Sequence, residues 1–196
     1  TSCIETIAGK SGHTIIQVDQ NGQNCILLYG GANRSVTREF VDRVISKFER
    51  GDILLLQNEI NELSYIIDKA YERGLEIILN PSPYDQNLEG CDFGKISMFL
   101  LNEIEGEQIT GVCKPEEILD ELKERFPGVK VVLTLGGQGA VYQDQERCCR
   151  QGIYQVEAVD TTGAGDTFTG YFIASMLQGK EPQQCLTLAA KASAIA

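Results

Sequence analysis

The chain has 196 residues and a net charge of −11, with 42% hydrophobic and 23% charged residues. This is the composition of an ordinary globular protein with enough residues for one substantial core. An acidic surface repels phosphate backbones and anionic lipids, so we expect no nucleic-acid partner. No apolar run reaches membrane-spanning length, so we expect no membrane partner either.

Two predicted strands open the chain. Residues 13–19 and 25–29 are rich in β-branched and aliphatic side chains, and the link between them contains Asn21-Gly22. Asn-Gly between apolar strands is a strong hairpin signal, so we expect these two segments to pair. A pair of glycines then ends the strand pattern.

Strands and helices alternate through the rest of the chain. Segments that are mostly apolar predict strands at 53–57, 75–79, 96–101, 130–135, 140–143 and 153–156. Helical spacing of apolar residues predicts helices at 37–49, 63–71, 115–126, 163–178 and from 182 to the end. This alternation predicts an α/β fold, in which a mostly parallel sheet carries helices on both faces. Ligands of such sheets bind at the carboxyl ends of the strands.

The cysteines and the single histidine limit the chemistry. Seven cysteines are present, none in a C-x-x-C pair, and Cys148 and Cys149 are adjacent. Zinc spacing is therefore absent, and we expect free thiols in a reducing cytoplasm. His13 alone cannot supply a multi-histidine metal site, so acid–base chemistry is expected to use carboxylates.

The most specific motif is DTTGAGDTF at residues 160–168. Its glycines precede a long apolar helix, where backbone N–H groups at the helix start can converge on an anion. Asp166 then stands on the first turn, beside that anion position. Taken alone, a carboxylate there could simply stabilise the start of the helix.

The longer pattern D-T-T-G-A-G-D-T-F-x-G closely resembles the C-terminal signature of the ribokinase-like (PfkB) sugar kinases. The resemblance implies that Asp166 is the base that takes the proton from a sugar hydroxyl. It implies that the amides of Gly163, Ala164 and Gly165 stabilise charge on the transferring phosphoryl group. Phosphoryl transfer depends mainly on positioning and charge stabilisation, which such a segment can supply.

A second glycine-rich segment agrees with this resemblance. TLGGQG, at residues 134–139, follows a predicted strand and is similar to the family's T-L-G-x-x-G nucleotide loop. The resemblance implies that Thr134, Gly136, Gly137 and Gly139 contact the phosphates of ATP.

Cation sites follow from the same resemblance. Asn102 and Glu105 are similar to the family's N-x-x-E motif, in which Asn102 would reach the nucleotide phosphates and Glu105 would hold water ligands of Mg²⁺. Asp160 and Thr162 match positions that help to bind a monovalent cation, usually K⁺. ATP, Mg²⁺ and K⁺ are therefore the expected cofactors.

Three further segments favour ribose as the sugar. Gln57-Asn58-Glu59 resembles the ribokinase Q-x-E segment, in which Glu59 would approach the sugar substrate. Residues 80–83 resemble the N-P-A-P segment, and residues 31–33 resemble a G-A-N stretch. The expected reaction is ATP-dependent phosphorylation of D-ribose to ribose 5-phosphate.

The resemblance also divides the chain. Residues 1–33 are expected to form part of a small β lid with its return into the core, and residues 34–196 the α/β nucleotide-binding core. The lid could pair two copies into a homodimer. The start at Thr1 and a final helix without a stop signal indicate a chain that is incomplete at both ends.

Other functions stay open to different degrees. The acceptor could instead be fructose, 2-keto-3-deoxygluconate or a nucleoside. A regulator that binds nucleotide or sugar without catalysis would be expected to have lost its base, yet Asp166 is present. A dinucleotide-binding oxidoreductase would need G-x-G-x-x-G after its first strand, and here the glycine-rich motifs lie late in the chain.

Overall fold

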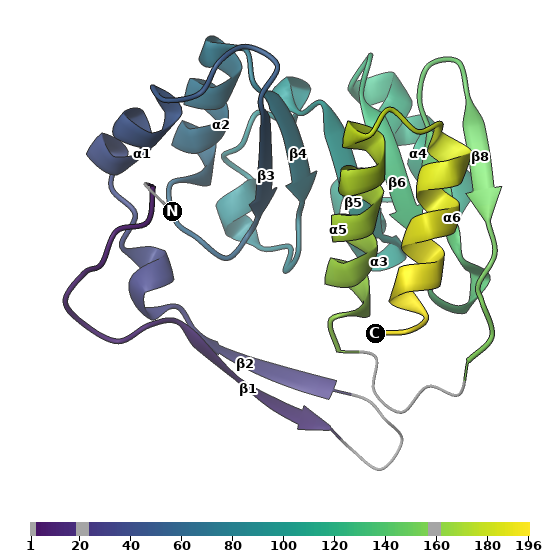
Figure 1. Ribbon diagram of the computed structural model, residues 1–196, viewed down its shortest axis with the longest axis horizontal. Helices are drawn as coiled ribbons and strands as arrows, with labels where there is room; N and C mark the ends of the chain where they lie inside the picture. Colours follow the sequence, from purple (N-terminus) through teal and green to yellow (C-terminus); the bar gives the residue numbers. More distant parts are fainter. Residues whose placement is uncertain (1–2, 19–23, 157–161) are drawn as a thin grey trace.

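The structure, a computed structural model, describes residues 3–18, 24–156 and 162–196 (Figure 1). Strands β1 (His13–Val18) and β2 (Asn24–Tyr29) form an antiparallel hairpin, as predicted, which projects from the rest of the protein in Figure 1. Its large apolar side chains, among them Ile15 and Leu28, are about half exposed, at 56% each. None of the hairpin side chains that the structure describes belongs to the two hydrophobic clusters.

The main sheet has six strands in the order β3-β4-β5-β6-β7-β8. Their bounds are β3 (Ile53–Gln57), β4 (Glu76–Asn80), β5 (Met98–Asn102), β6 (Lys130–Thr134), β7 (Ala140–Gln143) and β8 (Cys148–Gln151). Strands β3 to β6 are parallel, whereas β7 and β8 pair antiparallel. The prediction of a mostly parallel sheet is confirmed.

Helices cover both faces of this sheet (Figure 1). One face packs on α1 (Arg38–Ile45), α2 (Leu63–Arg73), α3 (Glu103–Thr110) and α4 (Pro115–Arg125), and the other on α5 (Ala164–Leu177) and α6 (Pro182–Ser193). Successive side chains of a strand point to opposite faces. Accordingly, Phe99 belongs to the first cluster, and its neighbours Met98 and Leu100 belong to the second.

The last strand of the sheet lies earlier than predicted. Residues 153–156 are irregular, so the strand expected there is wrong, and β8 (Cys148–Gln151) takes its place. The reason is the tight turn after β7, in which the Asp144 carboxylate accepts hydrogen bonds from the amides of Glu146 and Arg147. This turn brings β8 directly into register with β7. An edge strand needs no continuous apolar run, so its polar sequence hid it.

Helix α3 was also missed. It has eight residues and few apolar ones, so its spacing gave little sign of a helix. A capping box marks its start: Asn102 accepts from the Glu105 amide, and the Glu105 side chain accepts from the Asn102 amide.

In the described parts of the chain, none of the helices has the length and apolar character needed to cross a membrane.

Candidate active site

Four polar residues end the four parallel strands at one edge of the sheet. Gln57 ends β3, Asn80 ends β4, Asn102 ends β5 and Thr134 ends β6. Register pairs Gln57 with Asn80, and Asn102 with Thr134, so each pair lies side by side at this edge. Backbone pairing thus gathers residues that are distant in sequence at the edge where such sheets bind ligands.

Helix α5 begins next to this row. Its N-cap, Gly163, has φ +81°, a left-handed conformation that residues with a Cβ rarely adopt, and no side chain caps the helix. The first intrahelical bond runs from the Thr167 amide to the Gly163 carbonyl, at 2.9 Å. The amides of Ala164, Gly165 and Asp166 therefore have no acceptor within the helix. Together with the helix dipole, they make this end suited to an anion.

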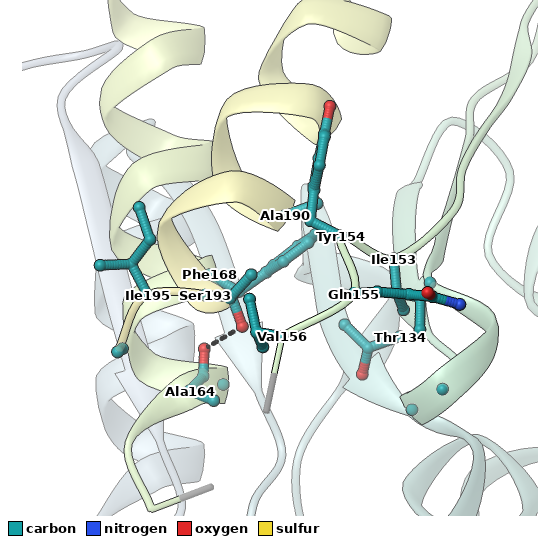
Figure 2. A pocket seen from close by; sticks show the side chains of 16 residues that line it. Thr134, Ile153, Tyr154, Gln155, Val156, Ala164, Phe168, Ala190, Ser193 and Ile195 are labelled. Carbon is teal, nitrogen blue, oxygen red and sulfur yellow. Dashed lines mark hydrogen bonds between the residues drawn. The ribbon is translucent and has the colours of Figure 1, made fainter. Parts of the chain in front are cut away.

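Two cavities meet at this helix end. The smaller, of about 190 Å³, lies over the strand ends, and its lining includes Asn102, Glu105, Gly163 and Asp166. The larger, of about 870 Å³, lies between the loop after β6, the segment 153–156 and the end of α6 (Figure 2). Because Thr134 and Gly165 line both cavities, a ligand in one lies beside a ligand in the other.

The larger cavity combines apolar walls with a glycine-rich turn. Ile153, Val156, Phe168 and Ile195 are among its lining residues, as Figure 2 shows. The turn that closes it includes Gly139, with φ +94°, where an added Cβ would collide with the Gln151 carbonyl oxygen. Apolar walls suit a flat ring system, and exposed backbone at glycines suits phosphate oxygens.

Two contacts join α5 to other elements beside these cavities. The Ser193 hydroxyl donates to the Ala164 carbonyl at 2.9 Å, which ties the end of α6 to the first turn of α5 (Figure 2). In the smaller cavity, Gln57 Nε2 donates to Asp166 Oδ1 at 3.2 Å. Among the described residues, no other hydrogen bond to the Asp166 carboxylate is present, and this side chain is exposed.

Glu105 is the carboxylate best placed to interact with a divalent cation here. It is 6% exposed, and its Oε2 accepts from the Asn102 amide at 3.0 Å, which leaves Oε1 for another donor or for water. Within the described ranges, no group of three or more His, Cys, Asp or Glu side chains could hold a metal ion. One carboxylate still fits Mg²⁺, which keeps several waters and binds chiefly to substrate phosphates.

Most of the predicted site residues lie together. The smaller cavity is lined by six of them, namely Asn102, Glu105, Thr134, Gly163, Gly165 and Asp166. The larger cavity adds Ala164, Gly136, Gly137 and Gly139.

Two predicted residues are not brought into this group, and a third lies outside the described residues. Glu59 is exposed on the turn after β3 and lines neither cavity. Thr162 is described and exposed, and it also lines neither cavity. Asp160 lies outside the described residues. The roles of these three residues stay predictions.

The sequence did not single out several residues that line the cavities. Thr169 stands one helical turn after Asp166, so the helical period could have pointed to it. Asn80 and Ser82 belong to a segment already compared with sugar kinases, but they were given no role. The contribution of residues 153–156 to the larger cavity was hidden by the strand predicted there.

Comparison with known proteins identifies the family. Residues 1–196 match the family described as pfkB family carbohydrate kinase. The chain belongs to this family. Two curated relatives are named as sugar kinases. A ribokinase of Arabidopsis thaliana is 33% identical, over 94% of this chain and 51% of its own length. A deoxyribokinase of Salmonella typhi is 30% identical, over 83% of this chain and 55% of its own length.

Solved structures agree on the fold. A ribokinase from Thermotoga maritima superposes with a TM-score of 0.80 at 30% identity, over 96% of this chain and 64% of its own. The structure of the Arabidopsis thaliana ribokinase complexed with ribose and ATP superposes with a TM-score of 0.75 at 28% identity, over 95% of this chain and 63% of its own. The pfkB chain described here therefore spans 51% to 64% of the length of these relatives.

Proposed function

We propose that this protein is an ATP-dependent sugar kinase that phosphorylates D-ribose to ribose 5-phosphate. The observation that carries the proposal is the position of Asp166, on the first turn of α5, where the two cavities meet at Thr134 and Gly165. A kinase needs a nucleotide site and an acceptor site that share one wall, with a base at the acceptor side. Membership of the pfkB family and the ribokinase relatives support the same activity.

The larger cavity is the proposed ATP site. Its apolar residues would contact the adenine ring, and Gly136, Gly137, Gly139 and Thr134 would lie along the phosphates. Asn102, at the end of β5, would reach the phosphates from the smaller cavity. The γ-phosphate would then lie at the junction of the two cavities, beside the first turn of α5. The complex of the Arabidopsis thaliana ribokinase with ribose and ATP supports this choice of nucleotide.

The smaller cavity is the proposed acceptor side. The hydroxyl oxygen of the sugar attacks the γ-phosphorus, the bond to ADP breaks, and Asp166 accepts the hydroxyl proton. The amides of Gly163, Ala164 and Gly165 stabilise the charge on the phosphoryl oxygens, with the positive end of the helix dipole behind them. Glu59 would contact the sugar from the turn after β3.

Cations complete the proposed chemistry. Mg²⁺, when bound, would neutralise charge on the β- and γ-phosphates, and Glu105 would hold its water ligands through Oε1. A K⁺ activator is proposed at Asp160 and Thr162 from the family resemblance alone. We propose a cytoplasmic location, since the expected free thiols suit a reducing compartment.

The hairpin is the proposed lid. Residues 1–33 would form part of this lid, and residues 34–196 the nucleotide-binding core. Exposed Ile15, Ile26, Leu27 and Leu28 support this assignment, because isolated hairpins rarely leave several large apolar side chains in water. A second copy could cover them, which would make the protein a homodimer through its lids.

A second candidate acceptor is 2-deoxyribose. The Salmonella typhi deoxyribokinase is 30% identical to this chain, close to the 33% of the ribokinase from Arabidopsis thaliana. Identity at this level does not separate two sugars that differ by one hydroxyl. A cavity that hydrogen-bonds the 2-hydroxyl would reject the deoxy sugar strongly, whereas an apolar wall would not.

The test is an assay of ADP release by the longest native form of the protein, with ATP and Mg²⁺. The acceptors are ribose, 2-deoxyribose, fructose, 2-keto-3-deoxygluconate and a nucleoside, each with and without K⁺. We expect ribose to give the highest kcat/KM and Asp166→Asn to abolish turnover. If another sugar is preferred and Asp166 still matters, the acceptor is wrong. Nucleotide binding without any phosphorylation would indicate a regulator instead.

A further inference from the structure

Gln57 makes the only side-chain hydrogen bond to the proposed base among the described residues. Its Nε2 donates to Asp166 Oδ1 at 3.2 Å, across 109 residues of sequence. Both residues line the smaller cavity, at the end of β3 and on the first turn of α5. The contact therefore joins two elements whose relative position decides where the carboxylate lies.

The backbone on both sides of Gln57 is firmly held. Before it, β3 pairs in parallel with β4, and Gln57 itself is in register with Asn80. After it, Asn58 is fully buried at 0% exposure, and its amide donates to the Ser82 carbonyl at 3.1 Å. The Asn58 side chain also donates to the Pro83 carbonyl at 2.7 Å and to Asp85 Oδ1 at 2.8 Å. A side chain placed between two such anchors has a defined direction.

The chemistry of the contact suits an auxiliary of a base. A carboxylate has two oxygens, and a neutral amide donor on Oδ1 fixes the rotamer while Oδ2 stays available for a proton. A lysine or arginine at this position would form an ion pair with Asp166 and compete with the proton that the base must accept. An amide orients the carboxylate without that competition.

From this arrangement we infer that Gln57 is a positioning residue for Asp166: it holds Oδ1 so that Oδ2 receives the proton of the sugar hydroxyl. This inference rests on the proposed kinase function. It assigns Gln57 no contact with the sugar or with ATP, so substitution should lower kcat and leave KM almost unchanged.

The main variant is Gln57→Met, which keeps the length of the side chain and removes its donor. We expect kcat to fall about 10- to 30-fold, with KM for ATP and for the sugar changed less than about threefold. Gln57→Glu should lower kcat further, since it places two carboxylates together.

Gln178→Met is the matched control. Gln178 is exposed at the opposite end of α5, so its loss should change neither kcat nor KM. Thermal unfolding of all variants shows whether they fold. An unchanged kcat in Gln57→Met, beside an inactive Asp166→Asn, would overturn the inference and leave the proposed function standing. A rise in KM for the sugar alone would also overturn it, because Gln57 would then be a sugar contact.

A second measurement needs no turnover. The side-chain carboxyl carbon of Asp166 can be followed by NMR at pH 7, with Asp166→Asn to assign the signal. We expect its chemical shift to differ between Gln57→Met and the unsubstituted protein, because the carboxylate loses a hydrogen-bond donor. Identical chemical shifts would refute the contact in solution, whatever reaction the protein catalyses. Active Asp166→Asn protein would refute the proposed base instead.

Discussion

Two aspartates at opposite edges of the same sheet have contrasting surroundings. Asp144, in the turn between β7 and β8, accepts five hydrogen bonds, from the Tyr142 hydroxyl, the amides of Glu146 and Arg147, and two nitrogens of the Arg147 guanidinium. Asp166, at the carboxyl edge, accepts one among the described residues. The first carboxylate is fully engaged in holding a turn, and the second has an oxygen, Oδ2, that accepts no hydrogen bond among the described residues.

The surroundings of Asp144 also hold its carboxylate in the charged form. Burial opposes ionisation of Asp144, but the hydrogen bonds from Tyr142, Glu146 and Arg147 outweigh it and lower its pKa to about 2. Burial has the largest effect on the Tyr142 hydroxyl and raises its pKa, and the hydrogen bond to Asp144 raises it further. A carboxylate so strongly held in its charged form is a poor proton acceptor near neutral pH. The number of donors around a carboxylate thus separates a structural aspartate from a candidate base.

The largest effect is expected from Asp166→Asn. Turnover should fall about 10²- to 10⁴-fold, because the amide cannot accept the hydroxyl proton. The midpoint of thermal unfolding should change little, since this side chain is exposed. Steady-state kinetics and calorimetry on the same sample measure both quantities. If Asp166→Asn lost stability but kept its turnover, Asp166 would be a structural residue and not the base.

Gly165→Ala sharpens the role of the helix start. An added Cβ at Gly165 meets no atom within 4 Å, so the fold should tolerate alanine. The methyl group would, however, project at a residue that lines both cavities, and we expect kcat/KM for ATP to fall about 10- to 100-fold. Gly90→Ala is a matched control, since its Cβ also meets nothing within 4 Å and it lies away from both cavities. Equal activity of Gly165→Ala and Gly90→Ala would contradict the proposal that Gly165 forms part of the wall between the two substrate cavities.

Cys91 extends the comparison to a partly buried group that accepts no hydrogen bond among the described residues. Desolvation, aided by Asp68, raises the pKa of its thiol to about 11. At pH 8 the thiol is almost entirely protonated, and we expect iodoacetamide to alkylate it at least about tenfold more slowly than the exposed Cys148. Mass spectrometry of timed samples gives both rates. Faster modification of Cys91 would mean that it is more accessible than the structure indicates.

Asp144→Asn should give the smallest effect, and it should act on stability alone. The folded-state pKa lies below the ordinary value of 3.8, so the stabilisation is fully present above about pH 4 and disappears as the pH falls toward 2. With allowance for partial solvent screening, we expect a loss of about 1 kcal/mol at pH 7. Urea unfolding at pH 7 and pH 2.5 measures the difference, which should shrink at the lower pH while kcat at pH 7 stays unchanged.

Much of the fold could be predicted because hydrophobic burial leaves a periodic trace. The runs at 53–57 and 130–135 lie within one residue of β3 and β6. β6 in particular is covered on both faces, and such strands are apolar throughout. β8 and α3 left no such trace. The first is fixed by hydrogen bonds in a turn and the second by a capping box, and both depend on a few polar residues.

The site shows the same division. The shared location of Gly163 to Asp166 at the start of a helix could be predicted, because these residues are consecutive in the sequence. Gln57 could be assigned no contact to Asp166 from the sequence, because only the packing of α5 beside the end of β3 brings the two together. Contacts across 109 residues depend on tertiary structure, and local spacing holds no record of them.

The shared wall of the two cavities has a consequence for inhibitor design. Because Thr134 and Gly165 line both, a short linker can join a nucleotide-like group to a sugar-like group without leaving the protein surface. Tethering makes the second binding event intramolecular, at an effective concentration in the millimolar range for a short flexible linker. Such a bisubstrate compound should bind far more tightly than either half, with its affinity greatest at the linker length that matches the separation of the two groups.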